Sequence, residues 1–231
     1  MIHPSWKIKD IDNENIAVML SYPLEYYQKR LIKLGFSGKG KILLDAGCGA
    51  GHWTVAASFL NKEVYGIDLT EKYLEVARTL KKNFHRQNIS LKLGKIEHLP
   101  YQDNFFDYII CYSVWMFVDK EKALAEFWRV LKPQGKLYLG SLTGKMWYPR
   151  LIWKGLKHGD FQLIWTSLQA IVKRIPLSPI LVERLLEKQG FKILELGADG
   201  KIGQKNLKIK PIYNDKIWGI WEVFELLGEK I

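Results

Sequence analysis

Three glycines and an aspartate lie close together in the sequence around residue 47, and a turn with these residues could bind a small ligand. An apolar run ends at Asp45, and glycines follow at alternate positions as Gly47, Gly49 and Gly51. In parallel α/β sheets, a strand that ends in a glycine turn and leads into a helix holds nucleotide-like ligands, because bare backbone and free helix N–H groups come close to them. We therefore expect a ligand site at residues 45–51.

The same spacing indicates which charge the ligand carries. Dinucleotide-binding loops usually read G-x-G-x-x-G and hold a pyrophosphate, whereas the third glycine here comes one position early and Asp45 precedes the first glycine. A carboxylate at that place would repel a diphosphate and attract an ammonium group. S-adenosylmethionine (SAM) carries an ammonium group and a sulfonium but no phosphate, so it fits this turn better.

A second acid, Asp68, ends the next strand-like run. It stands roughly 20 residues past the glycine turn, which is where an acid that binds ribose hydroxyls is expected. NAD would need this acid as much as SAM does. Asp68 therefore predicts a ribose and leaves the choice between the two ligands open.

Length and composition limit the architecture. The chain has 231 residues, of which 48% are hydrophobic, enough for one α/β domain with an added lid and too few for a second full domain. No apolar run reaches the length of a membrane-spanning helix, and the N-terminal residues lack the apolar region of a signal peptide. Cys48 and Cys111 suggest neither a disulfide framework nor a metal site. We expect a cytoplasmic protein without a metal.

The chain is strongly basic, with a formal net charge of +11. Such a charge fits a nucleic acid, an anionic lipid surface or an acidic substrate. It also fits a lysine-rich surface with no specific partner, since the lysines are scattered and form no long block. Both interpretations stay open.

Alternating apolar runs and helical patterns predict a parallel sheet with helices on both faces. N-caps are expected at Ser21, Thr70, Asp119 and Asp160. Tyr22, Tyr26 and Tyr27 would either face the ligand or pack the first of these helices onto the sheet. Strands are predicted at about residues 41–45, 64–68, 89–93, 107–112, 136–141, 191–196 and 218–227, and helices at about 21–34, 51–60, 70 onward, 119–131, 149–158, 160–175 and 178–189.

Two segments lie outside this alternation. Residues 1–36 are expected to form an N-terminal cap, of which the first twenty show no clear period. Residues 144–177 are rich in tryptophan and basic residues and are longer than the loops normally found inside a compact domain. They predict a functional helical insertion, with a helical pair that only covers the sheet edge as the alternative.

Several blocks of the sequence, at residues 44–49, 66–68, 99–101, 106–107 and 129–135, occur in the order and at the spacing of one family. With them the chain resembles the class I SAM-dependent methyltransferases, most closely the methyltransferase type 11 branch, over roughly residues 40–141. The resemblance implies a single domain over residues 1–231 with a doubly wound, mostly parallel, seven-stranded Rossmann-like sheet. It also implies a helical lid after the fifth strand, and SAM as cofactor.

The resemblance also assigns cofactor contacts by position. Asp45 and the glycine turn would contact the methionine end, Asp68 the ribose hydroxyls and Leu69 the adenine. The expected cofactor-binding residues are Asp45, Ala46, Gly47, Cys48, Gly49, Gly51, Asp68, Leu69, Ile96, Glu97 and Tyr112.

The sequence departs from the family after the third and fourth strands. Where relatives usually show Gly-Asp-Ala, this chain has Gly94-Lys95-Ile96, and a lysine cannot accept a hydrogen bond from the adenine amino group. Glu97 or the backbone of Ile96 would replace that contact. Where relatives often show Leu-His-His, this chain has Trp115-Met116-Phe117, so a family base is missing.

No catalytic residue is assigned. The other candidate bases are His52, His98, His158 and Asp160, and each histidine is more readily explained as a structural or surface residue. An easily ionised acceptor or a carbon nucleophile would need no strong base.

The residues expected to bind the acceptor are large and apolar. Trp115, Met116, Trp147 and Tyr148 predict a small, apolar or aromatic acceptor for an enzyme that moves a methyl group from SAM. Tryptophans beside basic residues also suit an anionic membrane surface, and with it a membrane lipid or quinone acceptor. RNA is a further alternative, ranked lower because no RNA-binding module is appended.

A non-enzyme alternative is a SAM-binding interaction module, favoured by the missing family aspartate and histidines. The oligomeric state is not readable.

Overall fold

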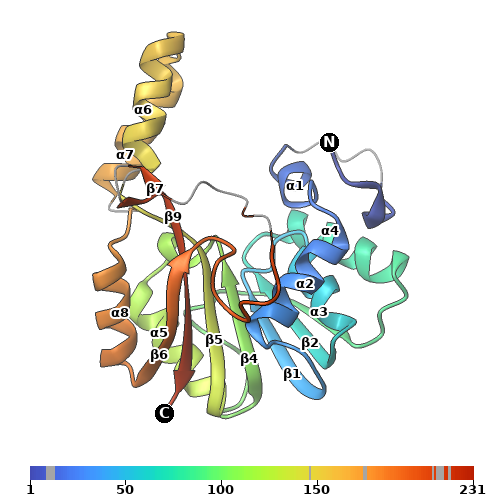
Figure 1. Ribbon diagram of the computed structural model, residues 1–231. Helices are drawn as coiled ribbons and strands as arrows, with labels where there is room; N and C mark the ends of the chain where they lie inside the picture. Colours follow the sequence, from blue (N-terminus) through green and yellow to red (C-terminus); the bar gives the residue numbers. More distant parts are fainter. Residues whose placement is uncertain (9–13, 146, 174–175, 210, 212–215, 218–219) are drawn as a thin grey trace.

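The structure is a computed structural model that describes residues 1–8, 14–145, 147–173, 176–209, 211, 216–217 and 220–231. One seven-stranded sheet forms its centre, with strand order β3-β2-β1-β4-β5-β9-β6 (Figure 1). Its strands are β1 (Gly38–Ala46), β2 (Asn61–Asp68), β3 (Ile89–Leu93), β4 (Phe106–Tyr112), β5 (Leu131–Thr143), β6 (Phe191–Ala198) and β9 (Val223–Lys230). Strands β1 to β5 pair in parallel, and β9 runs antiparallel to β5 and β6. The predicted doubly wound, mostly parallel sheet is confirmed.

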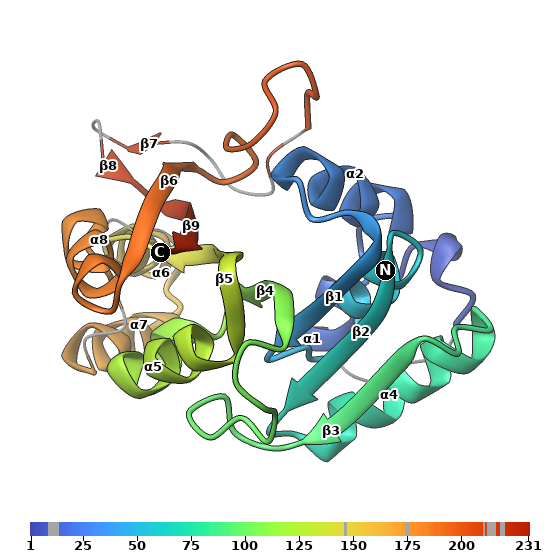
Figure 2. The same ribbon diagram turned by 90° about the horizontal axis from the view of Figure 1, so that it is seen from below.

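Helices cover both faces of the sheet (Figure 2). Successive strand residues point to opposite faces, so Leu43 and Leu44 belong to two different buried clusters. One cluster packs against α5 (Lys120–Val130) and α8 (Pro179–Lys188), and the other packs against α2 (Leu24–Leu34), α3 (His52–Ser58) and α4 (Glu71–Asn83). The remaining helices are η1 (Pro4–Trp6), α1 (Glu14–Met19), η2 (Trp115–Phe117), α6 (Trp147–His158) and α7 (Phe161–Val172).

The helix caps agree only in part with those predicted from the sequence. Asp119 and Asp160 accept hydrogen bonds from the backbone N–H groups of Lys122 and Leu163, as expected of N-caps. The prediction for Ser21 is wrong, because Pro23 occupies the N-cap of α2 and the Ser21 hydroxyl donates to the Val18 carbonyl. Thr70 holds the N-cap position of α4 without a side-chain bond.

The last strand also differs from its prediction at residues 218–227. The ladder with β5 begins at Val223, opposite Thr143, and continues to Glu229, opposite Lys136, whereas Lys230 pairs with Phe191 of β6. Ile220–Trp221 instead forms β8, which pairs with β7 (Lys216–Ile217), and residues 218 and 219 lie outside the described residues. An apolar run alone does not show where one ladder ends and another begins.

A buried arginine fixes α2 over the sheet. The Arg30 guanidinium donates to Asp199 at 2.9 Å, to the Tyr138 hydroxyl at 2.6 Å and to Glu225. Asp199 and Glu225 are buried as well, so this network joins α2 to β5, to β9 and to the turn after β6. Through it, α2 is held as one wall of the space above the sheet.

Helices α6 and α7 form an antiparallel pair that we call the hairpin. It follows β5 directly and projects beyond the carboxyl ends of the strands (Figure 1). Its helices lie within the predicted insertion at residues 144–177. Nothing in the described part of the chain is both long and apolar enough to form a membrane-spanning helix.

Candidate functional site

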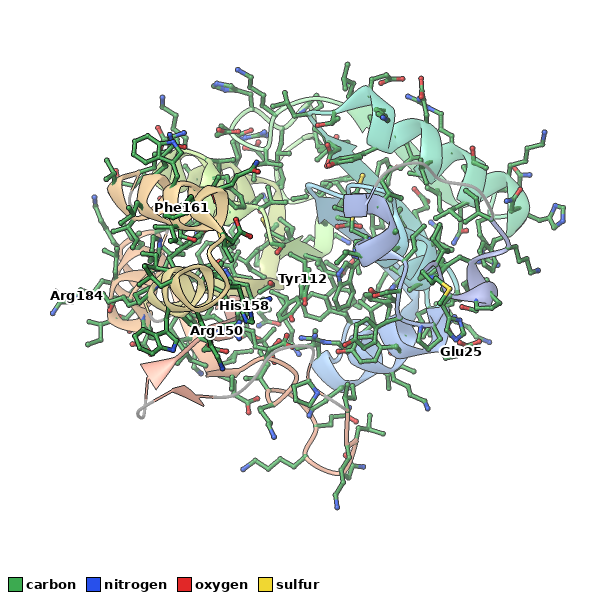
Figure 3. The ribbon with its side chains drawn as sticks, turned by 90° about the horizontal axis from the view of Figure 1, so that it is seen from above. Glu25, Tyr112, Arg150, His158, Phe161 and Arg184 are labelled. Carbon is green, nitrogen blue, oxygen red and sulfur yellow. The ribbon has the colours of Figure 1, made fainter. Side chains whose placement is uncertain are left out.

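A cavity of about 650 Å³ lies at the carboxyl ends of β1, β2 and β4, where a doubly wound sheet binds its ligands. Seen from above, Tyr112 stands near the centre of this edge (Figure 3). Glycines of the β1 turn form one side of the cavity and the N-terminal helices another. The described lining residues are Val18, Met19, Ser21, Tyr22, Tyr27, Gly47, Gly49, His52, Asp68, Tyr73, Tyr112, Ser113, Val114 and Phe117.

The glycine turn needs its glycines for conformation and for space. Gly47, Gly49 and Gly51 have φ values of 80°, 51° and 82°, in the left-handed region. A Cβ on Gly47 would lie 2.5 Å from Cγ2 of Val114, and one on Gly51 would lie 2.8 Å from Cβ of Ala77. The turn can therefore present only bare backbone to the cavity.

Asp68 is the acid that faces the cavity. It is 8% exposed, and its carboxylate accepts hydrogen bonds from the N–H of Gly49 at 2.8 Å and of Thr70 at 2.9 Å. A carboxylate has about four lone-pair sites, so two backbone bonds leave room for two hydroxyl donors. The residues present thus fit the ribose of SAM.

Asp45 lies beneath the turn and is not among the described residues that line the cavity. It is 1% exposed and accepts a 2.6 Å hydrogen bond from the Thr54 hydroxyl. Burial raises the pKa of Asp45 to about 7, the Thr54 hydrogen bond lowers it, and the Asp68 charge raises it. The protonation state of Asp45 therefore decides whether a negative charge lies under the turn.

The other expected cofactor residues are spread around this cavity. Tyr112 lines it, whereas Ala46, Cys48 and Gly51 are buried in the turn itself. Ile96 lies in the core, Glu97 is half-buried and Leu69 is exposed. Among the described residues, none of these last three lines the cavity.

The residues expected to bind the acceptor lie elsewhere. Trp115 and Met116 are buried in the core, and the Trp115 indole donates to the Lys120 carbonyl at 3.3 Å. The tight 3₁₀ turn η2 sends successive side chains in different directions, and its third residue, Phe117, is the one that lines the cavity. Trp147 and Tyr148 begin α6, half-buried, away from the described lining.

Sequence reasoning missed the contribution of the first helix. Val18 and Met19 line the cavity from α1, whose six residues are too few to show a period. Of the tyrosines considered, Tyr22 and Tyr27 line it, whereas Tyr26 packs against Tyr22 and Tyr27 and accepts a hydrogen bond from Arg30.

Among the candidate bases, only His52 lines the cavity within the described part of the chain. Burial lowers the pKa of His52 to about 3, so its imidazole is neutral and a weak base. Asp160 caps α7, and His98 and His158 are exposed.

Comparison with known proteins shows similarity to methyltransferases. A family model described as "Methyltransferase domain" matches residues 44–139. The chain is 32% identical to malonyl-[acyl-carrier protein] O-methyltransferase of Yersinia pestis over 161 residues, which cover 61% of this chain and 57% of that protein. It is 40% identical to demethylmenaquinone methyltransferase of Staphylococcus aureus (strain JH9) over 113 residues, 47% of this chain and 46% of that one. The chain thus spans about half the length of these curated relatives.

Solved structures match over more of the chain. YcgJ from Bacillus subtilis aligns over 89% of this chain and 98% of its own, with a TM-score of 0.61 at 20% identity. A SAM-dependent methyltransferase from Aquifex aeolicus aligns over 96% and 100%, with a TM-score of 0.63 at 17% identity. At these identities the likeness shows the fold.

The sheet order, the glycine turn and the acid after β2 define a Rossmann-like SAM-binding fold. Residues 44–139 match the methyltransferase domain, and the chain has the fold of solved SAM-dependent methyltransferases.

Proposed function

We propose that this protein transfers a methyl group from SAM to a small, apolar or aromatic acceptor. One observation carries the proposal: a single cavity joins the glycine turn and Asp68 to a wall of apolar and aromatic side chains. Bound SAM supplies the methyl group from its sulfonium, and the rest of SAM leaves as a neutral thioether. The protein therefore has to hold two molecules in line rather than activate a bond.

The cofactor side of the cavity is formed by this chain's own polar groups. Asp68 would hold the ribose hydroxyls, and the turn at Gly47 and Gly49 would receive the methionine end, with Asp45 beneath it. Leu69, Ile96 and Glu97, close in sequence to Asp68 and to the end of β3, would border the adenine. These assignments transfer the cofactor contacts of the family to the matching residues of this chain.

The acceptor side is apolar and has no strong base among the described residues. Met19, Tyr22, Val114 and Phe117 line it, and the histidine in the cavity, His52, has a pKa of about 3. A wall of this kind orients an apolar or ring-bearing molecule and excludes water. It suits an acceptor that ionises easily or reacts through carbon, which a demethylmenaquinone-type acceptor would satisfy.

Trp147 and Tyr148, at the start of α6, would contact a bound acceptor if the hairpin moved toward the cavity as a lid. Trp115 and Met116 would shape the pocket from below, since both lie in the core under η2. A cytoplasmic location remains our prediction.

The proposal is tested with SAM that carries a radiolabelled methyl group. The protein is incubated with it and a host cell extract, and the products are separated into organic-soluble, small aqueous and macromolecular fractions. We expect label in organic-soluble or small molecules, lost with Asp68→Ala. Label in RNA or protein would contradict the acceptor class, and SAM binding without label in any fraction would favour an interaction module.

A further inference from the structure

We propose that the α6–α7 hairpin docks this protein onto the surface of an anionic lipid bilayer. The proposal concerns the surface to which the protein binds and does not depend on the proposed methyl transfer. It rests on the packing of the hairpin, on the side chains that it exposes and on its charge.

The hairpin is packed with its small residues inside. Gly155 of α6 and Ser167 and Ala170 of α7 are its buried residues. A Cβ on Gly155 would lie 2.6 Å from Cγ1 of Ile164, so the two helices approach closely at this glycine. This close packing of small residues leaves the large apolar residues of both helices outside the contact.

The large apolar side chains of the hairpin point to solvent. On α7 they fall at spacings of three and four residues, which places them along one face. Their exposed fractions lie between 38% and 81%, and the hairpin projects away from the sheet (Figure 1). Exposed large apolar side chains gathered on one helix face mark an interaction site. The exposed side chains are Trp153, Leu156, Phe161, Trp165, Leu168, Ile171 and Val172.

The charge of the insertion favours an anionic partner. Its only acid is Asp160, whose carboxylate caps α7. Lys154 and Lys157 are exposed on α6, next in sequence to Trp153 and Leu156. The basic residues between positions 144 and 177 are Lys145, Arg150, Lys154, Lys157, Lys173 and Arg174, with His158 beside them. Apolar stripes flanked by lysines are the pattern of helices that lie in the membrane interface.

The dimensions exclude a spanning role for these helices. Each has 12 residues, which makes it roughly 18 Å long, whereas a bilayer core is about 30 Å thick. A second copy of the chain fits the surface less well, because a two-fold contact brings the same basic patch together from both copies, and the only acid of the insertion, Asp160, already caps α7.

The base of the hairpin contacts the residue before β9 and borders a second cavity. Arg150 forms an ion pair with the buried Glu222 at 2.5 Å, and the Gly144 N–H donates to the Glu222 carbonyl at 2.8 Å. Beside it lies a cavity of about 710 Å³ whose walls are mostly apolar and which carries Lys120 and Lys145. Apolar walls with two ammonium groups suit a lipid with an anionic head.

Co-sedimentation of the full chain with lipid vesicles tests the proposal. Vesicles of equal parts phosphatidylglycerol and phosphatidylcholine should bind the protein, more weakly as salt rises, and vesicles of phosphatidylcholine alone should bind it far less. Replacing Lys154 and Lys157 by Gln should weaken binding to the anionic vesicles about 25-fold, since each lysine near such a surface contributes about fivefold. Phe161→Ser with Trp165→Ser should weaken it further.

A second basic cluster supplies the matched control. Lys81 and Lys82 lie beside Arg78 and Arg86 around α4, far along the chain from the hairpin. Their replacement by Gln removes the same charge and should change vesicle binding less than twofold. Because all the variants change residues outside the SAM cavity, each should bind SAM like the parent.

Three results would overturn the proposal. The first is that the protein binds no anionic vesicles. The second is that the control pair weakens binding as much as the hairpin pair, because general surface charge would then explain it. The third is that gel filtration without vesicles shows a dimer that Phe161→Ser with Trp165→Ser abolishes, because a second copy would then cover the hairpin.

Discussion

The glycine turn and the hairpin both use small residues to bring chain segments close, with opposite results. At the turn, Gly47 and Gly51 allow close contact with Val114 and Ala77, and the neighbouring acids are buried and hydrogen-bonded. In the hairpin, Gly155 allows α6 and α7 to meet, but the large apolar side chains are left in solvent.

At the glycine turn, the polar and apolar groups find their partners within the fold. On the hairpin, large apolar groups stay exposed, where a binding partner would cover them. Buried polar groups are stable only when paired, which holds for Asp45 and Asp68 at the turn. Exposed apolar groups on the hairpin have no such compensation. Substitutions should therefore cost more stability in the first region than in the second.

The largest expected contrast is between two arginines that pair with buried acids. Arg30 is 2% exposed and Arg150 37% exposed. Arg30→Leu would leave Asp199 and Glu225 buried without this guanidinium and should lower the free energy of unfolding by about 3–5 kcal/mol. Arg150→Leu should cost about 1–3 kcal/mol, because water can reach the gap. Urea unfolding followed by circular dichroism measures both, and an equal or larger loss at Arg150 would contradict the expectation that the hairpin tolerates substitution better than the buried part of the fold.

A pH-dependent effect of similar size is expected at Asp45. Burial raises its pKa in the folded protein from the usual 3.8 to about 7, so the folded state keeps a proton that the unfolded chain releases between these values. The free energy of unfolding should therefore fall as pH rises from 4 to 7, by up to roughly 4 kcal/mol from this group.

Asp45→Asn cannot ionise but still accepts a hydrogen bond, so it should lack this part of the decline. Unfolding in urea at several pH values compares the variant with the parent protein. Parallel pH curves for the two would contradict the shifted pKa.

A smaller contrast is expected between two glycines with positive φ. Gly47 has φ 80° and no space for a Cβ, whereas Gly159, between α6 and α7, has φ 67° and nothing within 4 Å. Gly47→Ala combines backbone strain with a clash and should cost about 2–4 kcal/mol. Gly159→Ala carries the strain alone and should cost about 1 kcal/mol. If thermal unfolding gave the same loss for both, the crowding at the turn would not matter.

The parts of the site that depend on local demands were predictable from the sequence. Gly47, Gly49 and Gly51 follow from the needs of a tight turn after a buried strand, and Asp68 from its place at the end of the next strand. The sheet followed from the alternation of strands and helices, and its strand ends did not, because pairing decides where β5 and β9 stop.

Other features depend on packing between distant segments. Trp115 and Met116 point into the core because η2 turns them under β4 and β5, which a list of residue types does not show. Val18 and Met19 reach the cavity from a helix too short to carry a pattern. The environment of Asp45 depends on Thr54 and on full burial.

Calorimetric titration with SAM tests the central claim most directly. The claim is that the glycine turn and Asp68 form a SAM site, so the protein should bind SAM, and Asp68→Ala should weaken binding by at least about 100-fold, because two hydrogen bonds to a charged acceptor are lost. Asp103→Ala, which changes an acid that is 68% exposed, is the matched control and should leave the affinity unchanged. Tight binding of NADH with no binding of SAM, or an unchanged affinity in Asp68→Ala, would contradict the account.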